Sequence, residues 1–323
     1  MTGLLVAKQI LMTLYSKYEV YITPLLKFLL ALISLLLINS RMGYMDSIDR
    51  MTVVLIVSLM CSFMPMNFIV IMAVLFVMLH LYAFNLECTI VVGVGFLLMF
   101  LLYLRFSPKD TLVVLLMPVC FLLRIPYVIP LAMGLIGTPV SAVSIACGVI
   151  AYYMLHFVTQ NVSAILAMAD EGMTVRFKYV VDGILNNREM VITIVAFAVT
   201  VILVYLIRRL SIDYAWTIAM AAGVVVNITV VLVGDLMFDT NVALLEVVLG
   251  NILSLLIAVI LQFFVFNVDY SRTEKVQFED DEYYYYVKAV PKISVSRPEK
   301  KVKQINSQKS KTISRTKSAH GER

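Results

Sequence analysis

The sequence predicts an all-α integral membrane protein: a polytopic helical bundle of about 8–10 spans, since about 20 apolar residues are needed per crossing. Hydrophobic residues make up 61% of the chain and charged residues 15%, against about half and about a quarter in soluble domains. The apolar runs end near Phe266, where the chain turns polar and basic. Near-continuous Leu, Ile and Val favour helices, which satisfy their own backbone amides in lipid, over alternating β-barrel strands.

The N-terminal segment, residues 1–20, interrupts its apolar residues with Lys8, Lys17 and Glu19. A cleavable signal peptide would place charge first and an unbroken apolar run after it, so this segment does not fit one. Its Leu and Ile spacing predicts an amphipathic helix instead. This helix lies either on the membrane surface or half-buried against the bundle.

Residues 21–270 form the predicted transmembrane domain. Its strong spans are Ile22–Ile38, Phe68–Phe84, Thr89–Leu104, Val140–Val158, Met190–Ile207, Tyr214–Val233 and Val242–Phe266. Two more apolar stretches, Met51–Phe63 and Thr111–Leu123, are short, and each runs into a proline-containing turn that breaks a helix. The second stretch and Pro126–Gly137 form either two short crossings or one re-entrant hairpin.

The two short stretches resemble each other. Ser47–Leu55 matches Ser107–Leu115, and Pro65 falls against Pro126 after a one-residue gap. An internal hairpin repeat is one interpretation, and such repeats are common in transporters. Chance similarity between Leu- and Val-rich segments is the other.

Positive charge predicts the orientation. The tail from Arg272 to Arg323 holds thirteen Lys and Arg against seven Asp and Glu, which indicates a cytoplasmic C-terminus in a cell (cytoplasmic) membrane. Counting back along the spans makes the N-terminus cytoplasmic and residues 159–189 extracytoplasmic. Within 159–189, Thr174–Leu185 shows the spacing of an amphipathic helix that lies on the outer surface or caps the bundle.

Glu246 is the leading candidate for a functional side chain, because polar groups at membrane depth are costly. It lies one turn into the last span and shares a helix face with Gly250 and Ser254, beside Asn251. We interpret Glu246 and Asn251 as part of a substrate or ion pathway. The alternatives are an interfacial carboxylate and a structural hydrogen bond.

Asn227 and Asp235 belong to the preceding span and its outer end, eight residues apart and close to one helix face. Across a tight outer hairpin they would meet Glu246 and complete a small acidic pocket on the same pathway. Plain solvation of Asp235 is the alternative.

Arg124 is the remaining pathway candidate. It occupies a turn flanked by Pro118, Pro126 and Pro130, and broken helices of this kind often line binding sites in transporters. The alternative is a short turn that reaches the headgroups, where Arg124 pairs with a phosphate.

The C-terminal tail, residues 271–323, has two parts. The first is a predicted partner-docking motif in which an acidic run precedes tyrosines that favour a strand: Glu279, Asp280, Asp281, Glu282, Tyr283, Tyr284, Tyr285 and Tyr286. From Lys292 onward the composition is that of a disordered, basic segment, which predicts contact with anionic lipid headgroups. Nucleic-acid binding would use the same electrostatics but is disfavoured here.

Metal and cofactor chemistry find no support in the sequence. The four cysteines, Cys61, Cys88, Cys120 and Cys147, are far apart and form no CxxC pair, so we expect small apolar side chains. His80 and His156 have no second ligand at helical spacing, so we predict neither a metal site nor a cofactor.

No Walker loop, HExxH motif or nucleophile elbow is present, so no enzyme is predicted. The favoured function is a permease-like transport component of unknown substrate, in contact with the lipid bilayer. The alternative is a non-transporting scaffold subunit of a cell-envelope or secretion assembly, docking partners through its tail. A cytoplasmic ATPase or assembly protein is the candidate partner subunit.

Overall fold

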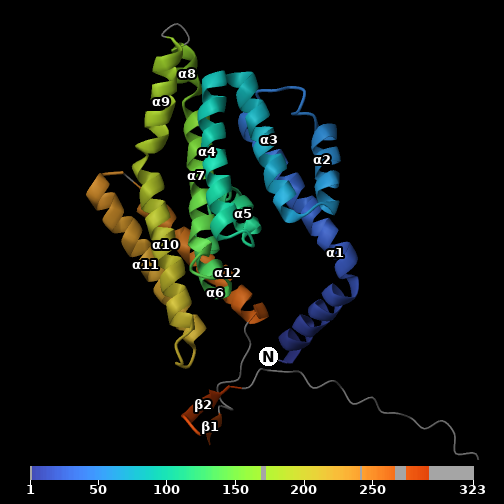
Figure 1. The fold of residues 1–323 in the computed structure, drawn as a ribbon, viewed down its shortest axis with the longest axis vertical. Coiled ribbons are helices and arrows are strands. Elements are labelled where there is room, and N and C mark those ends of the chain that lie inside the picture. The colour runs from blue at the N-terminus through green and yellow to red at the C-terminus, as the bar shows by residue number, and fades with distance from the viewer. Residues whose placement is uncertain (1, 169–171, 241, 266–273, 291–323) are drawn as a thin grey trace, which may run out of the picture.

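The structure, a computed structural model, describes residues 2–168, 172–240, 242–265 and 274–290. These residues form α-helices and one β-hairpin (Figure 1). The helices are α1 (Thr2–Met42), α2 (Met51–Phe63), α3 (Met66–Phe84), α4 (Leu86–Phe106), α5 (Thr111–Leu122), α6 (Val128–Ile136), α7 (Ser141–Gln160), α8 (Val162–Ala167), α9 (Met173–Leu185), α10 (Arg188–Arg208), α11 (Ala215–Phe238) and α12 (Leu244–Val265).

Seven helical segments in the described part are long and apolar enough to cross a membrane. Each overlaps one of the strong spans predicted from the sequence, with α9 and α10 together making one segment of 36 residues. The short stretches are helices α2 and α5, of 13 and 12 residues. The prediction of a polytopic all-α membrane bundle is therefore confirmed.

Helix α7 lies inside the bundle, with α1 to α4 on one side of it and α10 and α11 on the other (Figure 1). Its interior position depends on close approach to α5. A Cβ added to Gly148 would lie 2.5 Å from the Cβ of Met117, so only glycine permits this packing. Small residues at such contacts are typical of helix pairs in membranes.

Helices α5 and α6 are joined by a sharp turn at residues 123–127, where Arg124 has a φ of 61°. Their 12 and 9 residues give lengths of about 18 Å and 14 Å, short of the roughly 30 Å hydrocarbon core. The lengths favour one re-entrant hairpin over two crossings. The matching pair α2–α3 is also helix, turn, helix, but α3 has 19 residues, so the internal repeat stays a prediction.

Helix α1 runs unbroken into the N-terminal segment, with a kink at Tyr18. The section before the kink is largely exposed from Val6 onward. It meets the bundle at the far end of the chain, where Lys8 donates a hydrogen bond from Nζ to the carbonyl oxygen of Phe263 at 2.6 Å.

Helix α9 is the segment expected either to lie on the outer surface or to cap the bundle. It runs in line with α10 and alongside α4 and α7 (Figure 1). Val180 and Ile184, on its predicted apolar face, are buried there. This part of the apolar face packs against helices, whereas Met173 and Phe177 on the same face are exposed.

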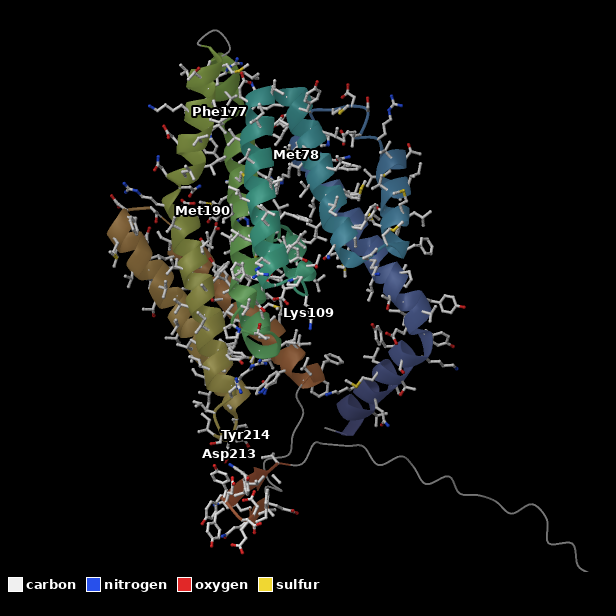
Figure 2. All side chains as sticks on the ribbon, viewed as in Figure 1. Met78, Lys109, Phe177, Met190, Asp213 and Tyr214 are labelled. Atoms are coloured by element: carbon white, nitrogen blue, oxygen red, sulfur yellow. The ribbon has the colours of Figure 1, made fainter. Side chains whose placement is uncertain are left out.

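The tyrosine run forms strand β2 (Tyr284–Ala289), which pairs antiparallel with β1 (Glu274–Glu279). This hairpin lies beyond the end of the bundle that carries Asp213 and Tyr214 (Figure 2). Lys288 of β2 forms an ion pair with Asp213 at 2.6 Å. The basic stretch predicted to be disordered, from Lys292, lies outside the described residues.

Candidate functional site

A groove of about 1100 Å³ opens along the bundle, with α1 and α3 on one side and α5, α7 and α12 on the other. Small-molecule pockets usually measure about 300–1,000 Å³, so the groove is large enough for a substantial ligand. The polar side chains that line it are Ser34, Ser40, Arg41, Arg124, His156, Thr159, Gln160 and Glu246. Valines, leucines and other apolar residues line the rest.

Arg124 and Glu246 meet at the edge of this groove, with 3.4 Å between Nη1 and Oε1. Arg124 comes from the α5–α6 turn and Glu246 from the first turn of α12. Their side chains are 83% and 66% exposed. An exposed pair of this kind contributes at most about 1 kcal/mol to stability, so a ligand could replace either partner at little cost.

Gly250 allows the turn to lie against α12. A Cβ at Gly250 would lie 2.7 Å from the ring of Tyr127, the last residue of the turn. Gly250 therefore permits close packing of α12 against the α5–α6 hairpin. It places Glu246, one helical turn earlier, beside Arg124.

A series of stacked rings forms one wall of the groove. Phe121 stacks on Tyr152 at 4.2 Å, and Tyr152 stacks on His156 at 5.4 Å. Arg41, at the end of α1, lies within electrostatic range of both Tyr152 and His156. The rings thus extend from the Arg124 turn toward Arg41.

Sequence reasoning missed this wall and considered His156 as a possible metal ligand. The spacing of Tyr152 and His156, one helical turn apart on α7, was the available signal. Their partners from α1 and α5 are distant in sequence, and no periodicity within α7 points to them.

Asn227 and Asn251 lie inside the bundle, in a separate polar network. Asn227 donates from Nδ2 to Oγ1 of Thr200 at 3.1 Å, and Asn251 donates from Nδ2 to Oδ1 of Asn227 at 3.4 Å. All three side chains are buried. The network joins α10, α11 and α12. Asn251 Oδ1 accepts no hydrogen bond from the described residues.

Asp235 belongs to a third set of contacts, at the α11–α12 connection. Its Oδ1 accepts hydrogen bonds from Thr240 Oγ1 at 2.8 Å and from the backbone N–H of Val242 at 3.0 Å. The structure thus brings Arg124 to Glu246 and Asn227 to Asn251. The acidic pocket expected from Asn227, Asp235 and Glu246 is not formed by these contacts, because Glu246 turns toward Arg124.

A second ion pair was missed altogether. Glu87 and Arg176 approach to 2.8 Å, with side chains only 6% and 19% exposed. The pair joins the first turn of α4 to α9. The sequence placed both residues in outer loops, and their separation of 89 positions gave no reason to pair them.

The predicted docking residues occupy the hairpin tip. Glu279 ends β1, residues 280–283 form the turn, and Tyr284, Tyr285 and Tyr286 lie in β2. The turn is held by Asp280, whose pKa is lowered by the backbone N–H of Glu282, by the Tyr285 hydroxyl and by the backbone N–H of Tyr283. The tip therefore presents its carboxylates and tyrosines to solvent in a defined arrangement.

No protein-family model, curated protein or solved structure matches this chain.

Proposed function

We propose that the protein is a permease-like transport component of a cell membrane, with the groove as its substrate pathway. The observation that carries the proposal is the Arg124–Glu246 contact at the groove edge, where the α5–α6 hairpin breaks. Discontinuous helices at transporter sites bring backbone ends and charged side chains to a substrate in this way. Because this ion pair is long and exposed, both charges remain available to a substrate.

Water access along the groove tests this proposal. In a background with the four buried cysteines replaced by alanine, Leu249→Cys introduces a thiol on the groove wall of α12. Val248→Cys is the matched control, because Val248 is exposed at the same depth but does not line the groove. A charged thiol reagent that cannot cross membranes is then compared with a lipid-soluble one.

We expect the charged reagent to modify Leu249→Cys much faster than Val248→Cys, while the lipid-soluble reagent modifies both. Equal, slow reaction of the two variants with the charged reagent would exclude an aqueous pathway and with it the transport proposal.

The orientation belongs to the same proposal: both termini are cytoplasmic. The support is the basic excess of the tail directly after α12. A reporter active only outside the membrane, fused after Arg323, should stay inactive. Strong external activity would invert the arrangement.

The scaffold function remains the second candidate, favoured by the β-hairpin. A two-stranded hairpin is at best marginally stable alone in water, and here every residue of both strands is exposed. Deleting residues 274–290 separates the two candidates. A scaffold that docks partners through the hairpin would no longer co-purify with them after this deletion, whereas a transport component would keep its activity.

A further inference from the structure

We infer that the groove binds an anionic phospholipid taken from the surrounding bilayer, with the phosphate between Arg41 and Arg124. The inference deepens the proposed function by naming the substrate class, and it rests on the groove being the site of that function. The division of the groove into a polar end and an apolar remainder is the first reason.

The polar residues occur at matching ends of the lining stretches. On α1 the lining runs from Ser34 to Met42 and has Ser40 and Arg41 near its end, and on α7 it runs from Ala151 to Gln160, with His156, Thr159 and Gln160 in its last part. On α5 it ends at the Arg124 turn, and on α12, which meets that turn, it begins at Glu246. An amphiphile matches this division, since its headgroup and its hydrocarbon need different surroundings.

The charge of the groove favours an anionic ligand. The charged groups on the groove are two guanidinium groups and one carboxylate, so the groove carries a net positive charge. Within the described part of the chain, Arg41 has no ion-pair partner. Guanidinium groups bind phosphate oxygens in pairs of parallel hydrogen bonds, which makes arginine well suited to a phosphodiester.

The backbone at Arg124 supports the same conclusion. Its φ of 61° is a left-handed conformation that glycine or asparagine adopts more readily. Strained residues of this kind concentrate at ligand sites. The turn thus presents a guanidinium to the groove at a position where its backbone is unfavourable.

The aromatic wall completes the site. Phe121 and Tyr152, stacked on each other, line the groove together with both arginines, and much of the remaining lining is apolar, with side chains such as Val74 and Leu115. These surfaces would hold the glycerol region and an acyl chain. A small soluble anion would leave all of this apolar surface uncovered.

Binding to the purified full-length protein in a neutral detergent tests the inference. The probes are short-chain phosphatidylglycerol, phosphatidylcholine of the same chain length, and soluble glycerol phosphate. The variants are Arg41→Gln and Arg124→Asn, since asparagine tolerates the left-handed backbone. Lys109→Gln is the control, because Lys109 is an exposed cation that does not line the groove (Figure 2).

Phosphatidylglycerol should bind most tightly, and each arginine variant should weaken it about tenfold, equivalent to about 1.4 kcal/mol. Lys109→Gln should leave it unchanged. Equal weakening by Lys109→Gln would mean nonspecific attraction of anionic lipid. Equal affinity for phosphatidylcholine would mean an unselective amphiphile site, and equal affinity for glycerol phosphate a soluble-anion site. Each of these results overturns the inference.

The two proposals fail separately. If Leu249→Cys reacts with the charged reagent but neither arginine variant changes the affinity for phosphatidylglycerol, the phospholipid site is refuted and the transport proposal stands. If lipid binding follows the arginines but the groove is closed to the charged reagent, the site stands and transport through it does not. Circular dichroism of each variant confirms that the helices are retained.

Discussion

Glu87 and Arg176 form a 2.8 Å ion pair that is almost fully enclosed by protein, between α4 and α9. Arg124 and Glu246 form the other extreme, a 3.4 Å pair with both side chains largely exposed. Removing one partner of a buried pair leaves an uncompensated charge, which costs about 3–5 kcal/mol. The two pairs therefore provide an internal comparison.

We expect Arg176→Met to lower the free energy of unfolding in mild detergent by about 3 kcal/mol, whereas Glu246→Gln should change it by less than about 1 kcal/mol. The double variant Glu87→Leu/Arg176→Met should recover part of the loss, because no charge remains unpaired. Similar effects of Arg176→Met and Glu246→Gln would show that the two environments do not differ as described.

The strained backbone at Arg124 leads to a second prediction. Arg124→Gly should raise the free energy of unfolding by about 1 kcal/mol, because glycine adopts the left-handed conformation without the Cβ clash. Leu123→Gly is the control, since Leu123 has a φ of −84° and gains nothing from glycine. Unfolding of both variants is measured in the same detergent. Stabilisation by Leu123→Gly as well would point to a general effect on the turn.

The buried amide network of Asn227 and Asn251 leads to a third prediction. Asn227→Leu removes the link between Thr200 and Asn251, and we expect a loss of about 1 kcal/mol, the usual size of an interhelical hydrogen bond in a membrane protein. Thr229→Val should have little effect, because that hydroxyl bonds only the backbone of its own helix, at Val225. If Asn227→Leu and Asn251→Leu give strictly additive losses, the two amides do not act together.

A fourth prediction concerns the hairpin and pH. The pKa of Asp280 is lowered by hydrogen bonds from Glu282, Tyr285 and Tyr283. Its contribution to turn stability is therefore present above the unfolded pKa, about 3.9, and is lost as pH falls through the lower folded value. The pKa of Tyr285 is raised by its bond to Asp280. That contribution is present below the unfolded pKa, about 10, and is lost as pH rises through the folded value.

Amide chemical shifts at residues 282 and 283 should accordingly stay constant near neutral pH and change at both extremes. Asp280→Asn should weaken the turn at neutral pH, whereas Asp281→Asn should not, since Glu282, Tyr283 and Tyr285 donate their hydrogen bonds to Asp280. Identical shifts in the two variants at neutral pH would refute the role given to Asp280.

Hydropathy alone located the long helices, because a bilayer demands apolar length and little else. The prolines around Arg124 likewise indicated a broken hairpin. What the sequence did not reveal was partnership between distant positions. Arg124 and Glu246 lie 122 residues apart. The face of α9 that contains Val180 and Ile184 was identifiable from its spacing. The spacing does not show, however, whether that face lies on lipid or packs against α4 and α7.

The same limit applies to the polar candidates. Glu246 and Asn251 are neighbours on one helix, yet one faces the groove and the other the buried network, because five residues turn a helix well past one full rotation. Only the packing of α6 and α11 against α12 decides which environment each side chain meets.

The in-line arrangement of α9 and α10 has a consequence for the shape of the protein in its membrane. Together they span 36 residues, or about 54 Å at 1.5 Å per residue, against a hydrocarbon core of about 30 Å. About 24 Å of this column must therefore stand clear of the hydrocarbon, braced against α4 by Glu87 and Arg176. The protein would therefore project beyond the hydrocarbon core on that side, and a partner in the water could contact this part of the column without entering the lipid.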